Sequence, residues 1–342
     1  MEHQELPIPQ HFNPDRVGDV WRVSYQERAT EAEKWAQAHD IAPSDEDTHK
    51  ISLLLVDVQN TFCIPGFELY VAGRSGTAAV DDNRRLCEFM YRNLDVITEI
   101  SPTLDTHTAF QIFHALFLVD SAGNHPEPFT TVTEEDVKNG TWKFNNKLSH
   151  SIGLDPQKAE RYLRHYTREL TADKKYDYTI WPYHAMLGGI GHALVSSIEE
   201  AVFFHSVARC RPTDFHVKGD NPITENYSVL SPEVTRDDED KPIAQKDVGF
   251  IERLLDFDAV MIAGQAKSHC LLWTLHDLLD EIKQTDEELA KKVYILDDCT
   301  SSIVVPGGVD YTEATEAAFQ RFASAGMHIV RSTETLETWP LM

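Results

Sequence analysis

The chain has 342 residues, of which 42% are hydrophobic and 10% aromatic, enough for one large α/β domain or two small ones. Its 56 acidic residues against 31 basic ones give a formal net charge of −25. This acidic balance argues against a nucleic-acid partner and against an anionic membrane surface, because both require a basic footprint. No apolar run approaches the ~20 residues of a membrane span, and the first residues lack a charged-then-apolar secretion signal.

The cysteines are five in number, lie far apart in the chain and include no Cys-x-x-Cys pair. An odd, scattered set of this kind is typical of free thiols in a reducing compartment, not of a disulfide framework or a structural zinc site. We therefore expect a cytoplasmic protein. The five are Cys63, Cys87, Cys210, Cys270 and Cys299.

The elements expected along the chain begin with a polar segment, residues 1–50, which contains one helical pattern at 24–40 and is expected to pack on the core as an N-terminal extension. From residue 51 to 335, short apolar runs alternate with amphipathic stretches. The apolar runs, each expected to be a strand, are 51–56, 101–104, 214–217, 259–264, 292–296 and 328–330. The helical patterns are 80–99, 194–208, 246–256, 271–283 and 312–325. This alternation predicts an α/β fold: a doubly wound, mostly parallel six-stranded sheet with helices on both faces.

Residues 120–180 interrupt the alternation. They carry Pro, Gly and Asn and only one helical pattern, near 157–170. So long an excursion from a compact sheet domain is usually functional. We therefore expect an insertion within the domain of residues 51–335, acting as a lid or as an oligomer contact.

Four of the predicted strands lead to residues that can do chemistry. Asp57, Asp105 and Lys218 directly follow the first three strands, and a short turn after the fourth leads to Cys270. Ligands of open α/β sheets bind beyond the carboxyl ends of the strands, so these side chains should meet at one edge. Each alone has a common structural explanation: a turn or cap for Asp, the surface for Lys and the core for Cys. Their convergence is what favours a reactive site.

Together these groups suit acyl transfer. A thiol that begins a helix lies at the positive end of the helix dipole, which favours the thiolate, and a nearby lysine favours it further. A carboxylate can accept the thiol proton, and backbone N–H groups in the turn before the helix can stabilise an oxyanion. The pattern predicts an Asp–Lys–Cys site built from Asp57, Lys218 and Cys270.

A second group of residues has the chemistry of a metal site. Asp105, His107 and His114 lie close together in the stretch "DTHTAFQIFH", and His184 follows the rigid Pro182 in "WPYHAMLGGIG". A carboxylate and imidazoles in this arrangement indicate a shell for a divalent metal ion. Ordinary loop or core histidines remain a competing explanation, since the chain has 16 histidines.

The chain resembles the nicotinamidase/pyrazinamidase branch of the isochorismatase-like cysteine hydrolases. Five matching segments occur in the order of the family and span roughly residues 51–330. The metal-type residues point to the nicotinamidase branch, because other relatives generally lack that metal site. The matching segments are "LLLVDVQNTFC" (53–63), "LDTH…H" (104–114), "WPYHAMLGGIG" (181–191), "FHVKG" (215–219) and "IAGQAKSHC" (262–270).

The resemblance implies a role for each catalytic residue. Asp57 would be the base, Cys270 the nucleophile, and Lys218 the residue that holds and polarises them. The backbone N–H groups of Ala266 and Cys270 match the oxyanion hole of the family, which has a cis peptide here, between Gln265 and Ala266.

The resemblance also implies how a ring-shaped amide is held. Phe62 and Trp181 match aromatic residues that sandwich the ring of the substrate, although ordinary core packing would also explain them. A divalent metal ion, whether zinc, iron or manganese, orients the pyridine nitrogen of nicotinamide in the family. Its ligands would be Asp105, His107, His114 and His184.

The function implied is a metal-containing cysteine amidohydrolase that cleaves a small carboxamide through a Cys thioester, with nicotinamide, converted to nicotinate and ammonia, as the first candidate. This would place the enzyme in NAD metabolism. Family members commonly self-associate, so a homo-oligomer is compatible with the resemblance. Among the departures from the family, Lys267-Ser268 stands where Thr-Asp is frequent, and Ala185 stands where Cys is common.

Two alternatives remain open from the sequence. The first is an isochorismatase-like hydrolase acting on another amide, a ureido compound or a vinyl ether, without a functional metal. The second is a protein that is not a hydrolase: a catalytically silent binding protein, or a redox protein that uses Cys270 as a peroxide-sensitive thiol.

Overall fold

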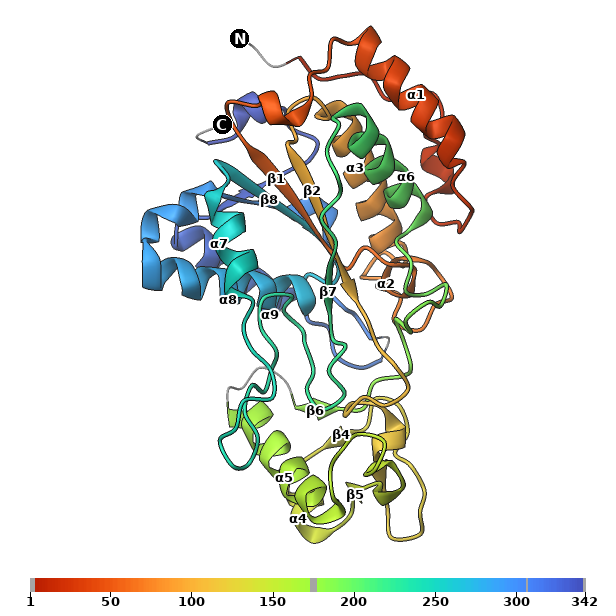
Figure 1. The fold of residues 1–342 in the computed structure, drawn as a ribbon, viewed down its shortest axis with the longest axis vertical. Coiled ribbons are helices and arrows are strands. Elements are labelled where there is room, and N and C mark those ends of the chain that lie inside the picture. Colours follow the sequence, from red (N-terminus) through yellow and green to blue (C-terminus); the bar gives the residue numbers. More distant parts are fainter. Residues whose placement is uncertain (1–3, 173–176, 306, 341–342) are drawn as a thin grey trace.

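A six-stranded sheet forms the centre of the molecule, with strand order β10-β9-β8-β1-β2-β7 (Figure 1). The computed structural model describes residues 4–172, 177–305 and 307–340. All pairings within this sheet are parallel, so the doubly wound six-stranded sheet predicted from the sequence is confirmed. Its strands are β1 (Ile51–Val56), β2 (Glu99–Asp105), β7 (His216–Lys218), β8 (Ala259–Gly264), β9 (Val293–Leu296) and β10 (His328–Val330).

Strand β1 shows why this sheet needs helices on both faces. All of its side chains are buried. Leu53 and Leu55 belong to one hydrophobic cluster, and Leu54 and Val56 belong to another. Because successive side chains of a strand point to opposite faces, an uninterrupted apolar run must be covered on both. The first face is covered by α3 (Ala78–Arg92) and α6 (Ser196–Ala208), and the second by α7 (Val248–Asp256), α8 (Cys270–Thr285) and α9 (Thr312–Ser324).

The helix predicted at 80–99 is the one whose extent was wrong. It ends at Arg92, and β2 begins at Glu99. The side-chain amide of Asn93 donates to the carbonyl oxygen of Phe89 at 2.9 Å, which closes the last turn of α3. Leu94 and Ile97 continue the apolar spacing of the helix, but they are buried in the turn that follows it. Their burial, not their helicity, explains the pattern.

The N-terminal segment lies against α6 (Figure 1). Its helix α1 (Tyr25–Ala38) is close to the prediction of 24–40. Ser196 Oγ both accepts from Trp21 N and donates to Trp21 O, each at 2.9 Å. Arg209, at the end of α6, forms a buried ion pair with Asp47. These contacts attach residues 4–50 to the face of the sheet that α6 covers.

A smaller body with its own hydrophobic cluster lies below the sheet in Figure 1, and we call residues 112–180 the lower unit. Its helix α5 presents Tyr162, Leu163 and Tyr166 to the cluster at helical spacing. The segment 120–180 is therefore not an unstructured excursion. The main elements of the lower unit are β3 (Leu118–Val119) paired antiparallel with β5 (Lys143–Phe144), β4 (Thr131–Val132) paired antiparallel with β6 (Tyr178–Thr179), and the helices α4 (Glu134–Asn139) and α5 (Pro156–Ala172).

No helix within residues 4–172, 177–305 or 307–340 combines the length and the apolar character of a membrane span.

Short helices complete the described chain. The short helices are η1 (Pro14–Arg16), η2 (Ser44–Glu46), α2 (Asn60–Cys63), η3 (Ala115–Phe117), η4 (Asn146–Leu148), η5 (Glu287–Lys292), η6 (Asp297–Cys299) and η7 (Leu336–Thr338).

Candidate active site

The carboxyl ends of β7, β2, β1 and β8 lie side by side at one edge of the sheet. Asp57 directly follows β1, Asp105 ends β2, Lys218 ends β7, and Cys270 begins α8 after the turn that follows β8. Their residues are 0%, 3%, 3% and 9% exposed, respectively. The structure therefore brings together, away from water, the four side chains that the sequence placed at strand ends.

Lys218 is the centre of this group. Its Nζ lies 2.8 Å from Asp105 Oδ1, 3.1 Å from Asp57 Oδ2 and 3.6 Å from Cys270 Sγ. It also donates to the carbonyl oxygen of Asn226 at 2.9 Å. Burial alone would lower the pKa of Lys218, but the two carboxylates outweigh it and raise the pKa well above its usual range. The ammonium thus stays charged and holds a carboxylate and the thiol on either side.

Asp57 is held in place by a residue that the sequence did not single out. Thr103 Oγ1, on β2, donates to Asp57 Oδ1 at 2.5 Å and accepts from Asp57 N at 3.0 Å. Burial raises the pKa of Asp57, and Lys218 opposes that effect. Thr103 lies inside β2, before the strand end at which the sequence analysis looked for reactive residues, so the sequence did not single it out.

The thiol of Cys270 differs from the expectation in one respect. The start of a helix and a nearby lysine were expected to favour the thiolate. Burial instead raises the pKa of Cys270 well above its usual range; Lys218 lowers it, and the neighbouring carboxylate of Asp57 raises it again. Burial disfavours the charged sulfur more than the nearby lysine favours it. The resting group is therefore a neutral thiol beside a carboxylate.

The turn that carries Cys270 holds two backbone N–H groups that have no acceptor in the described chain. The Gln265–Ala266 peptide is cis, as the resemblance implied. A Cβ at Gly264, where φ is +120°, would lie 2.0 Å from the carbonyl oxygen of Val56, so this position requires glycine. Among the hydrogen bonds of the described chain, neither Ala266 N–H nor Cys270 N–H donates to an acceptor. Both residues line the pocket described below.

The candidate metal ligands lie beside the ammonium. Asp105, His107 and His184 are buried and offer ligand atoms that all lie within 4.8 Å of one another. His107 Nδ1 lies 3.0 Å from Gly219 O, and His184 Nδ1 lies 2.8 Å from Pro182 O. Because a carbonyl oxygen only accepts, Nδ1 is the donor in each of these contacts, and Nε2 of each ring is directed at Asp105 Oδ2, at 2.8 and 3.4 Å. Three converging lone pairs with outer partners fit a divalent cation.

His114 is placed differently from the other three. Its ring centroid lies 6.0 Å from that of His107 and 6.1 Å from that of His184, and its nitrogens fall outside the cluster. Neither nitrogen has a partner with hydrogen-bond geometry in the described chain, although the backbone of Thr108 and Ala109 slightly raises its pKa. Burial and the two other histidines dominate and lower that pKa to about 3. The structure thus gathers three of the four predicted ligands.

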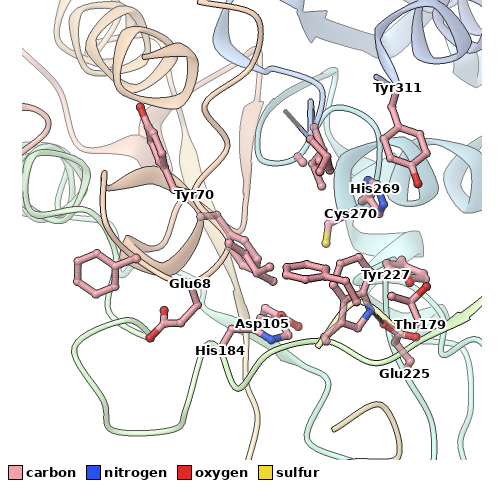
Figure 2. Close-up of a pocket in the computed structure, with 18 of the residues that line it drawn as sticks. Glu68, Tyr70, Asp105, Thr179, His184, Glu225, Tyr227, His269, Cys270 and Tyr311 are labelled. Carbon is pink, nitrogen blue, oxygen red and sulfur yellow. Dashed lines mark hydrogen bonds and ion pairs between the residues drawn. The ribbon is translucent and has the colours of Figure 1, made fainter. Parts of the chain in front are cut away.

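A cavity of about 610 Å³ opens onto these groups (Figure 2). The sulfur of Cys270 points into it from α8, with Asp105 and His184 on its opposite side. Phe62 and Trp181, the predicted ring-holding residues, both line it. The lower unit contributes further residues to the same wall: Phe129, Thr131 and Thr179.

Glu225 is a pocket residue that the sequence analysis missed. It lies in the loop after β7, and its Oε1 accepts a hydrogen bond from Trp181 Nε1 at 2.7 Å. Burial raises its pKa to about 8, and the charge of Glu233 contributes. The search for residues at strand ends could not find it, because a loop position has no register that predicts where its side chain points.

Lys267 and Ser268, which differ from the Thr-Asp frequent in the family, do not line the pocket. Lys267 Nζ lies 2.7 Å from Asp297 Oδ1, and it sits 4.3 Å from the centroid of the Phe319 ring on α9. Ser268 Oγ accepts from Ile303 N at 3.1 Å. These residues fasten the turn to the segments around it, while Cys270 and Ala266 face the cavity.

Comparison with solved structures finds nicotinamidases. The yeast nicotinamidase bound to the inhibitor nicotinaldehyde is 18% identical, with a TM-score of 0.50, over 82% of this chain and 99% of that chain. The Acinetobacter baumanii nicotinamidase is 18% identical, with a TM-score of 0.49, over 84% of this chain and 99% of that one. The Pyrococcus horikoshii pyrazinamidase in complex with zinc is 18% identical, with a TM-score of 0.44, over 82% and 99%.

No family model and no curated protein matches the chain. The match to the yeast enzyme covers nearly all of that chain, so the doubly wound α/β fold predicted from the sequence is confirmed. In particular, its fold is that of the yeast nicotinamidase.

Proposed function

We propose that the protein is a metal-containing cysteine amidohydrolase that cleaves a small carboxamide, with nicotinamide as the first candidate. The observation that carries this proposal is the meeting of the Cys270 thiol, the Asp57 carboxylate and the Lys218 ammonium at the base of a cavity lined by aromatic side chains. Neutral thiol, base and cation in contact are the parts that acyl transfer to sulfur requires.

In the first half of the reaction, Cys270 Sγ attacks the carbonyl carbon of the amide as its proton passes to Asp57 Oδ2. Because burial disfavours the free thiolate, sulfur loses its proton as the new bond forms. The negative charge that develops on the carbonyl oxygen is stabilised by the N–H groups of Ala266 and Cys270. Asp57 then gives the proton to the departing nitrogen, ammonia leaves and a thioester remains.

In the second half, water attacks the thioester carbon while Asp57 accepts a proton from it. The carbon–sulfur bond breaks, the carboxylic acid leaves, and the proton on Asp57 returns to sulfur. Lys218 is in contact with both Asp57 and Sγ, so its fixed charge stabilises whichever of the two is negative during each half. Thr103 keeps Asp57 pointed at the sulfur throughout.

The metal ion would be held by Asp105, His107 and His184, with His114 as a proposed further ligand. A zinc, iron or manganese ion there would supply a Lewis acid that binds a ring nitrogen of the substrate. Phe62 and Trp181 would hold the ring between their faces. We also propose that residues 51–335 form the hydrolase domain, that residues 1–50 extend it, and that the segment 120–180 serves as a lid or an oligomer contact.

The two alternatives differ from this proposal in what they require of the site. A hydrolase without a metal ion would not require Asp105, His107 and His184 to be buried with their ligand atoms within 4.8 Å of one another. A peroxide-sensitive thiol needs thiolate character and exposure, whereas Cys270 is buried and its pKa is raised. Both observations favour the amidohydrolase.

The test is ammonia release across a panel of amides headed by nicotinamide, with metal content determined on the same sample. Cys270→Ala and Asp57→Ala should each abolish ammonia release while circular dichroism stays unchanged. Cys210→Ala removes an exposed thiol away from the pocket and is the matched control. Full activity in either of the first two variants would overturn the proposal, and activity without bound metal would favour the metal-free relative.

A further inference from the structure

The cavity is larger than a single-ring amide needs. Nicotinamide has about nine non-hydrogen atoms, and at ~30 Å³ for each, the share of a water molecule in the liquid, it would fill less than half of the space. The cavity measures about 610 Å³, within the range of roughly 300–1,000 Å³ typical of sites for drug-sized ligands. The volume therefore points to a substrate with a body beyond the ring that carries the amide.

The cavity lining includes large apolar side chains that are exposed to solvent. Phe129 from the lower unit and Val305 and Val309 from the segment before α9 line it and are 58%, 47% and 55% exposed. Large apolar side chains left in contact with water at a pocket mouth gain free energy when a ligand covers them. A hydrophobic extension of the substrate is the ligand part that fits here.

The charge of the cavity restricts that extension further. Among the described residues that line it, Lys218 is the only lysine or arginine, and its ammonium is already in contact with Asp57, Asp105 and Cys270. Glu225 and Glu68 line the same cavity. A substrate with an anionic extension would meet two acidic side chains and no unengaged lysine or arginine, in a chain whose net charge is −25.

Glu225 is placed in the cavity wall where it can distinguish substrates by their charge. Its residue is only 6% exposed, and it is held by the hydrogen bond from Trp181 Nε1 to Oε1. Figure 2 shows it on the wall of the cavity, next to Thr179 and Tyr227. A carboxyl group fixed in a buried wall interacts more strongly with a ligand than an exposed one, because water and salt screen it less. Burial raises its pKa to about 8, and a positive group placed nearby would relieve the cost of its ionisation.

We propose that the preferred substrates are neutral or cationic primary carboxamides with an apolar body larger than one ring, and that Glu225 selects among them by accepting a hydrogen bond or a positive charge. This inference rests on the amidohydrolase activity proposed above. It adds the substrate class and a specificity-determining residue. Anionic amides are the class that the pocket rejects.

The test uses the purified full-length protein with its bound metal and four primary carboxamides. They are nicotinamide, a neutral biaryl carboxamide, and two analogues of the biaryl that carry an aminomethyl or a carboxylate group at the same position of the outer ring. The kcat/KM for ammonia release should be at least about 10-fold higher for the neutral biaryl than for nicotinamide. The aminomethyl analogue should exceed the carboxylate analogue by at least about 10-fold.

Glu225→Gln identifies the residue responsible. Glutamine keeps an acceptor oxygen for Trp181 Nε1 but cannot carry a charge, so the aminomethyl-to-carboxylate ratio should fall about 10-fold. Both rates come from one preparation, so the ratio does not depend on the fraction that is folded. Glu313→Gln, which removes an exposed carboxylate of α9 outside the pocket lining, should leave the ratio unchanged.

The outcomes separate this inference from the proposed function. Ammonia released from nicotinamide in preference to every biaryl overturns the claim about size. An aminomethyl-to-carboxylate ratio that Glu225→Gln leaves unchanged overturns the claim about Glu225. If no amide in the panel releases ammonia, the proposed amidohydrolase activity itself fails.

Discussion

The sheet edge and the lower unit make different contributions to the same cavity. The sheet edge supplies charged and ionisable groups, Asp57, Asp105, Lys218 and Cys270, all buried at or just after strand ends or at a helix start. The lower unit supplies neutral side chains, Phe129, Thr131 and Thr179, from two-residue strands and the loop beside them. The reactive groups thus come from the sheet, while part of the pocket wall comes from a unit with a separate hydrophobic core.

This difference has a physical reason. Four charged or ionisable groups in contact need backbones that cannot shift, and a parallel sheet fully covered on both faces supplies them. A pocket wall needs only a surface that fits the substrate. A small unit with its own core can present such a surface, and its residues can differ without disturbing the catalytic groups of the sheet. The comparison predicts that changes at the sheet edge affect the reaction itself, while changes in the lower unit affect stability and substrate binding.

The largest effect should come from the sheet edge. Cys270→Ala removes the nucleophile, and kcat for ammonia release should fall about 10³-fold or more. Unfolding by urea should change little, since the thiol makes few contacts that an alanine lacks. A residual rate within about 10-fold of the unmodified enzyme would show that the reaction does not pass through this sulfur.

The next effect should come from the core of the lower unit. Leu163, on α5, is fully buried among its neighbours, so Leu163→Ala leaves a cavity and should lower the free energy of unfolding by about 2–5 kcal/mol. The metal content of the folded fraction should not change, because the three clustered ligands, Asp105, His107 and His184, lie outside the lower unit. Arg168→Gln on the exposed face of the same helix is the control. A loss of metal in Leu163→Ala would show that the two regions are coupled.

A smaller effect separates the candidate ligands from one another. His184→Ala should weaken the binding of a divalent metal by about 10–100-fold. His114→Ala should weaken it less, because the nitrogens of His114 lie outside the cluster formed by Asp105, His107 and His184. Metal content after dialysis against graded chelator measures both. Equal losses in the two variants would make His114 a ligand.

The smallest effect is the pH dependence of stability at the pocket wall. The pKa of Glu225 is raised from 4.5 to about 8 in the folded chain. Between these values the folded state holds a proton that the unfolded chain has lost, so this group makes stability fall as pH rises through that window. Glu225→Gln has no proton to lose, so its stability relative to the unmodified protein should rise from pH 5 to pH 8.5, by at most about 1.4 kcal/mol per pH unit. Urea unfolding at both pH values measures this, and an equal difference at the two would contradict it.

Much of the fold could be read from local pattern. Apolar runs such as 51–56 and 259–264 lie within one residue of their observed strands. A short uninterrupted apolar run is the pattern expected of a strand that is buried on both faces. The helix predicted at 80–99 extended too far because Leu94 and Ile97, which lie after the end of α3, are buried at positions that continue the apolar spacing of the helix. The core of the lower unit was not predicted at all, since strands of two residues leave no periodic signal.

The sequence by itself determined which chemical groups reach the sheet edge, because a residue that directly follows a parallel strand must lie at that edge. The convergence of Asp57, Asp105, Lys218 and Cys270 follows from that rule. Only the tertiary structure decided the protonation of the sulfur, the exclusion of His114 from the cluster, and the positions of Thr103 and Glu225. These depend on burial and on contacts between residues far apart in the chain, which no local spacing records.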